Sequence, residues 1–394
     1  MMNSIELTNT YVTPTYNRIP VVFEKAEGYY IYDQDGKKYL DFTAGIGVNS
    51  LGYHHPDWVE ATQKQLSQLQ HISNLYYTEP SAQVAEKLCL HTGMQHVLFV
   101  NSGAESNEIA IKVARKYGHE QSPDKHKILT LSNSFHGRTV TTLSATGQDA
   151  FHKYFDPFTE GFDFIKTNNI DDLHQKVDQH VCAIMIEIVQ GEGGVVPLES
   201  DFIQEIADVC KQKDILLIID EVQTGIGRTG KLFAYEYYGL QPDIVTSAKG
   251  LGNGLPIGAA ILGEKVKDVL EPGDHGSTFG GNPVVTAGAN VVLETLTPAF
   301  LEKVHENSLY LIEKLEALDE VEEVTGLGLM VGITFKQATA KEVLSKAKEE
   351  GVLFLTAKDK LRLLPPLIID KAAIDEAVNC LDKVLKKEEA EVLK

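Results

Sequence analysis

The sequence has few of the features that mark secreted, membrane-bound or metal-binding proteins. Its four cysteines form no CxxC pair and no zinc-like spacing: Cys89, Cys182, Cys210 and Cys380. Scattered cysteines are typical of buried thiols in a reducing compartment, so disulfides and a cysteine-ligated metal are disfavoured. No apolar run approaches the roughly 18 residues of a membrane span, and "MMNSIELTNTYVTP" lacks the cationic start and apolar core of a signal peptide. We therefore expect a cytoplasmic protein without a metal site.

Basic residues are also scarce. Lys and Arg number 36 against 56 Asp and Glu, which gives a formal net charge of −20. Binding to phosphate-rich surfaces needs a surplus of cations, so nucleic acids and anionic membranes are disfavoured as partners. A small anionic substrate would need local arginines. Apolar residues make up 43% and charged residues 23% of the chain, which are ordinary values for a folded globular protein.

Short apolar runs alternate with helix-like segments between about residues 80 and 290. The segments "SNEIAIKVARKYG" and "SDFIQEIADVCKQKD" carry apolar residues at three- and four-residue steps, which is typical of helices. This alternation predicts an α/β fold, a large domain with a mainly parallel sheet flanked by helices. The predicted strands are "HVLFV" (96–100), "KILTL" (127–131), "CAIMIEIV" (182–189), "ILLIID" (215–220), "DIVTSA" (243–248) and "GAAILG" (258–263).

The two ends of the chain predict a second, smaller domain. A chain of 394 residues exceeds the size that one core usually serves. The stretch "GYYIYDQDGKKYLDF" is typical of a hairpin with "DQDG" as its turn, and strands alternate with helices after residue 298. We predict a large domain over residues 61–290 and a small α+β domain built from residues 1–60 and 291–394, with a cleft between them.

Polar and glycine-rich segments follow five consecutive predicted strands. They read "NSGAES", "SNSFHGRT", "QGEGG", "DEVQTG" and "AKGLGNG". Ligands of open parallel sheets bind beyond the carboxyl ends of the strands, so chemistry is expected in these segments. In "NSGAES", Ser102 and Glu105 predict a capping box at a strand-to-helix junction whose free N–H groups suit a phosphate. A capped helix that binds nothing stays open as an alternative.

The stretch "TGIGRTGKLF" imitates two nucleotide-binding motifs. Gly225, Gly227 and Gly230 match GxGxxG, but the stretch stands apart from its strand and opens no clear helix. The same residues match GxxxxGK, but Leu232 follows where magnesium binding needs Ser or Thr. We therefore reject both a dehydrogenase and an ATPase interpretation, each of which would predict binding of NAD or ATP.

Two charged residues end apolar strands. Asp220 closes "ILLIID", where a carboxylate is costly to bury unless a cation or donor meets it; a salt bridge or a helix cap is the alternative. Lys249 follows "DIVTSA", where partial burial would lower its pKa and free its amine to condense with an aldehyde, although a lysine more often reaches out to solvent. An aspartate, a lysine and a phosphate-ready helix start are the three groups that pyridoxal phosphate requires.

These segments together resemble a known family. The ordered motifs "NSGAES", "SFHGRT", "IVQGEGG", "IIDEVQTGIGRTG", "SAKGLGNGLPIGA" and "GSTFGGNP" are similar to those of class III pyridoxal-phosphate aminotransferases of fold type I, and within that family to the acetylornithine branch. The resemblance spans nearly the whole chain. It implies transamination between an ω-amino acid and 2-oxoglutarate; both Lys249 and Asp220 are present, so a catalytically silent relative is disfavoured.

The resemblance assigns cofactor contacts residue by residue. Lys249 is the lysine that bonds to the cofactor and moves the substrate proton, and Asp220 keeps the pyridine nitrogen protonated. The cofactor contacts are Ser102, Gly103 and Ala104 at the phosphate, Phe135 stacked on the ring, the run Glu221, Val222 and Gln223, and Thr278 from the neighbouring subunit. Thr278 thereby implies a homodimer. Alternation along an extended chain instead points Glu221 away from Asp220 and gives it a structural role. No role is assigned to His136.

The resemblance also assigns the substrate contacts. Arg138 binds a substrate carboxylate, and Arg362 binds the α-carboxylate of glutamate or 2-oxoglutarate, since planar guanidinium groups suit carboxylates. Glu192 pairs with Arg362 when the ω-amino substrate is bound and releases it for the oxoacid. Ser277 and Tyr16 are further candidates. A surface ion pair is the alternative for each arginine.

The catalytic residues do not separate the members of this family. Gly45 stands where ornithine aminotransferases resemble one another in carrying a tyrosine, which implies room for an acylated substrate. Acetylornithine is therefore the expected amino donor. Ornithine, 4-aminobutyrate and succinylornithine stay open as alternatives.

Overall fold

The computed structural model describes residues 2–392, with the side chains described up to residue 386. Its centre is a seven-stranded sheet in the order β4-β12-β11-β10-β7-β5-β6. Strand β12 runs antiparallel to both of its neighbours, and the remaining pairs are parallel. The strands are β4 (His96–Val100), β5 (Lys127–Leu131), β6 (Phe162–Ile165), β7 (Val181–Ile186), β10 (Leu216–Asp220), β11 (Ile244–Ser247) and β12 (Gly258–Leu262).

The predicted α/β class is confirmed, with two differences in the strands. The predicted strand 182–189 ends at Ile186, and Val189–Gln190 forms a separate strand, β8, that pairs with β9 (Val196–Pro197). Strand β6 escaped prediction because its sequence FDFI is short and carries a polar residue among the aromatics. It lies at the edge of the sheet, where only one neighbouring strand demands apolar side chains.

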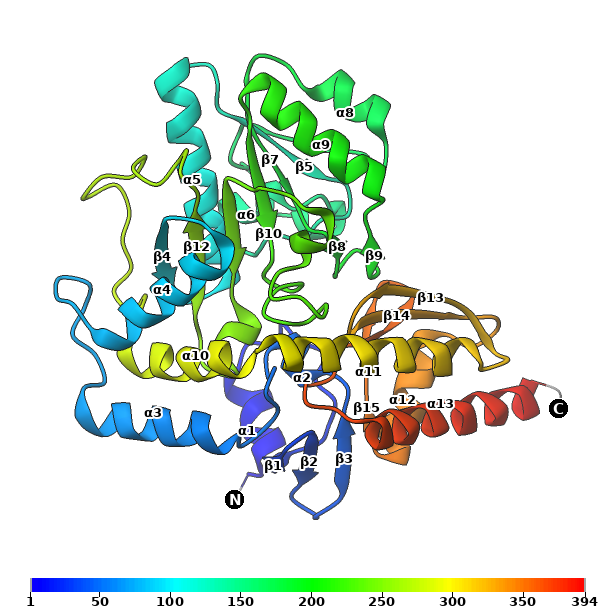
Figure 1. The fold of residues 1–394 in the computed structure, drawn as a ribbon. Coiled ribbons are helices and arrows are strands. Elements are labelled where there is room, and N and C mark those ends of the chain that lie inside the picture. Colours follow the sequence, from blue (N-terminus) through cyan, green and yellow to red (C-terminus); the bar gives the residue numbers. More distant parts are fainter. Residues whose placement is uncertain (1, 393–394) are drawn as a thin grey trace.

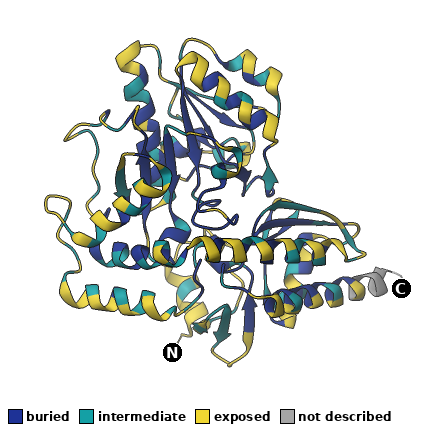
Figure 2. Cartoon of the chain, in the orientation of Figure 1, coloured by how far each residue is buried: buried dark blue, intermediate teal, exposed yellow. Residues whose placement is uncertain are grey.

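Helices cover both faces of the central sheet because its strands bury side chains on both faces. Alternate residues of β7 fall into two apolar clusters: Ile184 belongs to the cluster that includes Phe202 of α9, and Met185 to the cluster that includes Ile109 of α5. Figure 1 shows α5 and α9 on either side of the strands, and Figure 2 shows the strands β7 and β10 buried. The helices of this region are α5 (Gly103–Gln121), α6 (Val140–Ala145), α7 (Asp149–His152), α8 (Ile170–Lys176) and α9 (Ser200–Lys213), with the 3-10 turns η1 (Ala234–Tyr238) and η2 (Lys249–Gly252).

Helices α3 (Pro56–Gln68), α4 (Glu79–Thr92) and α10 (Pro283–Thr295) pack together beside the sheet. Helix α11 (Pro298–Glu316) follows α10 at a bend of 74° and extends toward the C-terminal strands (Figure 1). Among residues 2–392, no single helix has the length and apolarity needed to cross a membrane; α10 and α11 reach that composition only as a bent pair. Each helix of this pair presents buried residues to the protein core.

The two ends of the chain meet in one sheet, which contains the predicted hairpin. Strands β1 (Phe23–Glu27), β2 (Tyr30–Asp33) and β3 (Lys38–Asp41) are antiparallel neighbours, and β15 (Val352–Leu353) adds to β3 in parallel. A second sheet has the order β13-β14-β17-β16. The remaining elements are α1 (Ser4–Tyr11), α2 (Ala44–Gly47), β13 (Val321–Leu327), β14 (Met330–Phe335), α12 (Ala340–Glu350), β16 (Leu355–Ala357), β17 (Lys360–Leu363) and α13 (Lys371–Val392).

The domain boundaries stay a prediction. The proposed limits at residues 60 and 290 fall inside α3 and α10. Strand β17 of the C-terminal part contacts loops of the central sheet, because its Arg362 reaches Glu192 and Gln223.

Candidate active site

A cavity of about 430 Å³ opens at the carboxyl ends of the central strands. The strands whose ends surround it run in the same direction, so loops from distant parts of the sequence meet there. Four of the five predicted strand-end segments line it, and the connection after β7 contributes Glu187 in place of the predicted "QGEGG". The lining residues are Val48, Asn101–Ala104, Asn107, Phe135–Arg138, Glu187, Asp220, Val222, Gln223, Ala248, Lys249 and Gly254–Ile257.

The first turn of α5 forms one wall of the cavity. Ser102 caps the helix, and its Oγ accepts the N–H of Glu105 at 3.2 Å. The Glu105 carboxylate reaches back to the N–H of Asn101 at 2.6 Å, one residue before the position that a capping box would use. A helix start presents N–H groups that lack intrahelical partners and favours negative charge. This wall can therefore bind a phosphate.

Gly103 allows this helix start to approach the loop after β10. A Cβ atom at this position would lie 2.6 Å from a methyl carbon of Val222. Any larger residue would therefore push the two cavity walls apart. The close approach brings the anion-binding wall and the loop that follows Asp220 to the same cavity.

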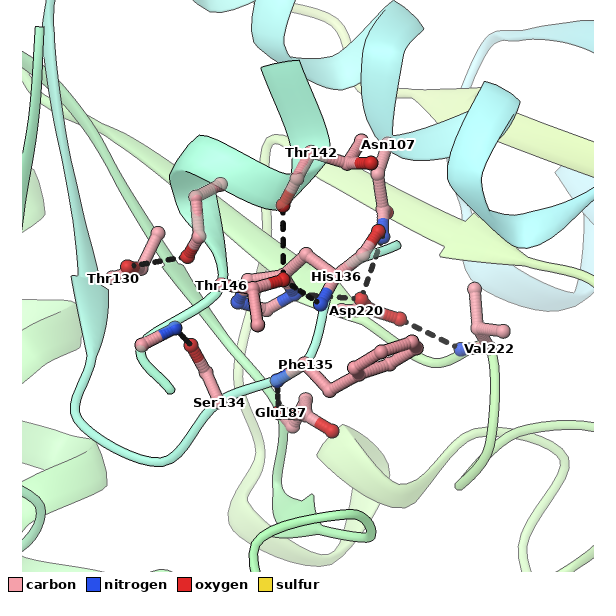
Figure 3. Close-up of polar contacts among 12 residues, drawn as sticks. Asn107, Thr130, Ser134, Phe135, His136, Thr142, Thr146, Glu187, Asp220 and Val222 are labelled. Atoms are coloured by element: carbon pink, nitrogen blue, oxygen red, sulfur yellow. Dashed lines mark hydrogen bonds and ion pairs between the residues drawn. The ribbon is translucent and has the colours of Figure 1, made fainter. Parts of the chain in front are cut away.

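Asp220 lies buried at the end of β10 and is held by three donors (Figure 3). Its Oδ2 accepts hydrogen bonds from Asn107 Nδ2 at 2.7 Å and His136 Nδ1 at 2.8 Å, and its Oδ1 accepts the Val222 N–H at 3.0 Å. The three donors fix the position of the Asp220 carboxylate in the cavity wall.

Three residues of this network were missed or left without a role by the sequence analysis. Burial alone would lower the pKa of His136, but the hydrogen bond and charge of Asp220 outweigh it and raise that pKa. Glu187 accepts the N–H of Phe135 at 3.0 Å, and burial raises its pKa to about 7, against the charge of His136. Glu187 follows the wholly buried strand β7, the same signal that singled out Asp220. Asn107 had no comparable signal because it lies inside a helix.

Lys249 lies in the cavity wall just after β11, the strand that pairs with β10. Thr246 of β11 lies opposite Asp220 in the register, so the lysine and the aspartate leave neighbouring strand ends. The backbone of Lys249 has φ = 40°, a conformation that costs a non-glycine residue of order 1 kcal/mol and is found mainly at functional sites. Burial lowers the pKa of the Lys249 ammonium; the Glu192 carboxylate opposes this shift and the Arg362 charge adds to it.

Arg362 and Glu192 form the ion pair that the resemblance implied. Arg362 Nη1 lies 2.6 Å from Glu192 Oε1 and 3.4 Å from Gln223 Oε1. The guanidinium is buried and the carboxylate is partly exposed. Because Gln223 itself lines the cavity, this pair lies directly behind the cavity wall.

Arg138 and Phe135 lie together on another side of the cavity. Both line it, and the Arg138 guanidinium stacks over Phe151 at 4.0 Å and approaches Phe135 at 5.5 Å from the ring centroid. Phe135 meets Phe151 edge to face. The cavity therefore has an aromatic wall beside an exposed cation, as well as the buried cation Arg362.

Glu221 does not line this cavity, and its assignment to the cofactor stays a prediction. Its buried carboxylate accepts hydrogen bonds from Thr224 Oγ1 at 2.5 Å and from the Tyr235 N–H at 2.8 Å. The alternation of side chains along β10 turns it to the face opposite Asp220, which is the structural role that this alternation predicted. Burial raises its pKa to about 7.

Three further predicted residues lie outside the cavity of their own chain. Ser277 Oγ accepts a hydrogen bond from the cavity residue Asn101 at 3.2 Å, so it lies one residue behind the wall. Thr278 is exposed to solvent, and its contact with a neighbouring subunit stays a prediction. Tyr16 is 73% exposed, with the Arg18 guanidinium over its ring, because the N-terminal segment around it is exposed throughout. The contact of Tyr16 with the pocket rim stays a prediction.

Gly45 belongs to a left-handed turn beside the cavity residue Val48. Residues 44–47 all have positive φ, from 45° at Ala44 to 72° at Gly47, and they include the β-branched Ile46 at 68°. Asp41 fixes the turn by accepting N–H groups of Thr43 and Ala44. This conformation is unfavourable for L-residues and is imposed by the surroundings. A Cβ atom at Gly45 would meet Asn49 Nδ2 at 3.3 Å.

Comparison with known proteins agrees with this geometry. The family model for class-III aminotransferases matches residues 11–385. The chain belongs to the class-III aminotransferase family. This aminotransferase is similar to the acetylornithine aminotransferase of Haemophilus ducreyi, with 51% identity over 97% of this chain and 98% of the relative.

Two solved structures of the family share the fold of this aminotransferase. The N-acetylornithine aminotransferase of Stenotrophomonas maltophilia K279a has a TM-score of 0.85 and 34% identity over 98% of this chain and 100% of its own. An ornithine aminotransferase of Toxoplasma gondii, with PLP at its active site, has a TM-score of 0.93 and 31% identity over 99% of this chain and 95% of its own. The enzyme is an aminotransferase, and its cofactor is pyridoxal 5′-phosphate.

The residues of the cavity fit this cofactor. Asp220 has hydrogen-bond donors around it but no Lys or Arg partner among the described residues, which leaves it available to a protonated ring nitrogen. Lys249 supplies an amine with a lowered pKa, and the α5 start supplies an anion site.

Proposed function

We propose that this enzyme transfers the terminal amino group of N2-acetyl-L-ornithine to 2-oxoglutarate, giving N-acetyl-L-glutamate 5-semialdehyde and L-glutamate, a step of arginine biosynthesis. The observation that carries the proposal is the Arg362–Glu192 pair beside a cavity that also contains Arg138. The amino donor presents one carboxylate and 2-oxoglutarate presents two. A site with one free arginine and one neutralised by Glu192 can therefore bind each acid in turn. The similarity to acetylornithine aminotransferases supports this donor.

The positions of the cavity residues support a set of cofactor contacts. The N–H groups of Ser102, Gly103 and Ala104 would hold the phosphate, Asp220 the ring nitrogen and Gln223 the ring hydroxyl, with Val222 and Phe135 against the ring. When bound, the cofactor supplies an aldehyde for the amino group and a ring that withdraws electrons.

The protein side chains control the proton and the substrate orientation. Nζ of Lys249, whose pKa is lowered by burial, accepts the proton from the amine-bearing carbon of the substrate. Arg138 orients the donor through its carboxylate. Glu192 pairs with Arg362 while the amino donor is bound and releases it to the second carboxylate of the oxoacid. Ser277 accepts a hydrogen bond from Asn101 and so holds this cavity residue in position.

Turnover of competing amino donors tests the substrate. We expect kcat/KM for acetylornithine to exceed that for ornithine and 4-aminobutyrate by at least tenfold, with succinylornithine as a side substrate. The TM-score of 0.93 to an ornithine aminotransferase makes ornithine the second candidate. A higher kcat/KM for ornithine would overturn the proposal and select that alternative.

Loss of the amine tests the site itself. Lys249→Ala should abolish the visible absorption band of the cofactor-loaded protein and lower kcat by roughly 10⁴-fold, because both the covalent bond and the proton acceptor are lost. Lys211→Ala, at an exposed position of α9, is the control and should retain band and activity. An unchanged band in Lys249→Ala would contradict the assignment.

We propose further that the enzyme is a homodimer whose Thr278 acts in the partner's site, because Thr278 is exposed and lies outside the cavity of its own chain. Light scattering should give twice the chain mass. Heterodimers of Lys249→Ala and Thr278→Ala chains should contain one intact site with the cofactor affinity of the unmodified enzyme. If Thr278 acts within its own chain, the site that retains Lys249 lacks Thr278. It would then bind the cofactor with the weakened affinity of the Thr278→Ala enzyme.

A further inference from the structure

The stretch "GIGRTG", which imitated a nucleotide loop, contains a wholly buried cation. Arg228 is 2% exposed and ranks among the largest fully buried side chains of the described chain. No helix opens at this stretch, which excludes the dinucleotide motif on structural grounds. Burying a guanidinium costs several kcal/mol unless hydrogen bonds compensate, so an apolar side chain of similar size would be the cheaper way to fill this space.

Arg228 donates hydrogen bonds to backbone carbonyls of the C-terminal part. Its Nη1 donates to Leu329 O at 3.2 Å and to Pro365 O at 2.5 Å. Its Nη2 has no hydrogen-bond partner among the described residues. Burial lowers the pKa of Arg228 to about 9, and the charge of the buried Asp41 opposes this shift. The side chain therefore joins three chain segments, and no carboxylate of the described residues is in hydrogen-bond contact with it.

The backbone around Arg228 makes the same junction. Its carbonyl accepts the N–H of Leu329 at 3.0 Å. Gly328, at φ = 61°, allows this contact, because a Cβ atom there would lie 2.4 Å from the Cα of Thr229. The β13–β14 turn and the loop after β10 are thus locked together at backbone distance.

The junction has a direct connection to the acceptor site. Pro365 lies three residues after Arg362, and Leu329 immediately precedes β14, which pairs with β17 and places Gly332 opposite Arg362. The loop that carries Arg228 also carries Gln223, which contacts Arg362 at 3.4 Å. Arg228 and Arg362 therefore bridge the same two segments at two neighbouring points.

We propose that Arg228 is a positioning residue for Arg362: it fixes β17 against the loop that carries Gln223 and so determines how tightly the site binds the dicarboxylate amino acceptor. This rests on the proposed role of Arg362. A guanidinium suits the task because two N–H groups on one rigid plane define both distance and direction between the segments. A movement of a few tenths of an ångström at Pro365 would displace the Arg362 fork from the carboxylate that it binds, whereas Arg138 lies on other segments and is unaffected.

Three variants of one residue and a matched control test the proposal. Arg228→Lys keeps donors for both carbonyls, and Arg228→Met keeps the volume without donors. Leu311→Ala is the control: it leaves a cavity at a buried position of α11 and costs roughly 2 to 5 kcal/mol of stability. Arg228→Gln, which keeps one donor group, replaces Arg228→Met if that chain does not fold. The measurements use the cofactor-loaded enzyme.

We expect Arg228→Met to raise both the KM for 2-oxoglutarate and the Kd of the unreactive dicarboxylate glutarate about tenfold, with the KM for acetylornithine changed less than twofold. Arg228→Lys should stay within threefold of the unmodified enzyme. Added to Arg362→Met, the Arg228→Met change should have less than a twofold further effect, since residues of one network do not act additively.

Equal effects on both substrates, no effect on glutarate, or the same selective effect in Leu311→Ala would overturn the positioning role and leave Arg228 as a structural contact. Failure of the proposed function gives a different result. If the unmodified enzyme does not turn over acetylornithine, the proposed amino donor is refuted. The Kd of glutarate would still decide the role of Arg228.

Discussion

The end of strand β10 presents two successive carboxylates to two different surroundings. Asp220 faces the cavity and is held by Asn107, His136 and the Val222 N–H, whereas Glu221 faces the core and is held by Thr224 and the Tyr235 N–H. Both are buried. The difference teaches that burial of a carboxylate does not identify a catalytic group. What identifies it is the cavity that the carboxylate lines and the donors that hold it there.

The largest expected effect separates the two carboxylates by activity. Asp220→Asn keeps the shape but removes the charge that faces the ring nitrogen, so kcat should fall roughly 10²- to 10³-fold, as for the loss of other preorganised electrostatic groups. Glu221→Gln should leave kcat within threefold. Steady-state kinetics with saturating cofactor provide the measurement, and losses of similar size in both variants would refute the comparison.

The second effect separates them by stability. Burial raises the pKa of Glu221 from 4.5 to about 7, so the folded state holds its proton more tightly than the unfolded state does. Its stabilising contribution is complete below pH 4.5 and is lost as the pH rises through 7, an effect of about 2 to 3 kcal/mol between pH 5 and 8. Glu221→Gln does not titrate and should lose correspondingly less stability over this range in urea unfolding. A parallel pH dependence in both proteins would contradict the pKa shift.

A third variant removes one donor from the Asp220 side. His136→Leu deletes the Nδ1 hydrogen bond to Asp220, and a hydrogen bond to a charged group contributes about 1.5 to 3 kcal/mol, so kcat should fall at least about tenfold. Thr130→Val is the control, because the Thr130 hydroxyl donates to the Ala145 carbonyl nearby without touching Asp220. Unchanged kcat in His136→Leu would mean that Asn107 and the Val222 N–H suffice.

The smallest effect comes from the corresponding donor on the Glu221 side. Thr224→Val removes the hydroxyl that donates to Glu221 and should lower the unfolding free energy by about 1 to 2 kcal/mol. The loss should be larger at pH 8, where the carboxylate is ionised, than at pH 5, and kcat should not change. A fall in kcat comparable to that of His136→Leu would show that the two sides of β10 are coupled.

Much of the central fold follows from local patterns in the sequence. The strands β4 and β5 coincide with the predicted 96–100 and 127–131, because short β-branched apolar runs between helical segments indicate buried strands. The edge strand β6 was missed because it lacks such a run. The division into domains, the cytoplasmic location and the dimer stay predictions.

The candidate site was predictable only in part. Charged residues at or just after the end of a strand, such as Asp220 and Lys249, carry a local signal, since a charge at the end of an apolar run needs a partner. Glu187 carried the same signal and was overlooked. Asn107 and Arg228 carried none, because an amide inside a helix and an arginine inside a glycine-rich loop are ordinary surface residues until the chain folds around them.

The sequence by itself determined where strands and helices form and which residue types follow each strand, because hydrophobic periodicity and turn chemistry act over a few residues. Only the tertiary structure decided which polar groups meet. Asn107 reaches Asp220 across 113 residues, Arg228 reaches Pro365 across 137, and Arg362 reaches Glu192 across 170. Contacts at such separations depend on how the chain crosses between sheets, and they distinguish the carboxylate that serves the cavity from its neighbour that stabilises the core.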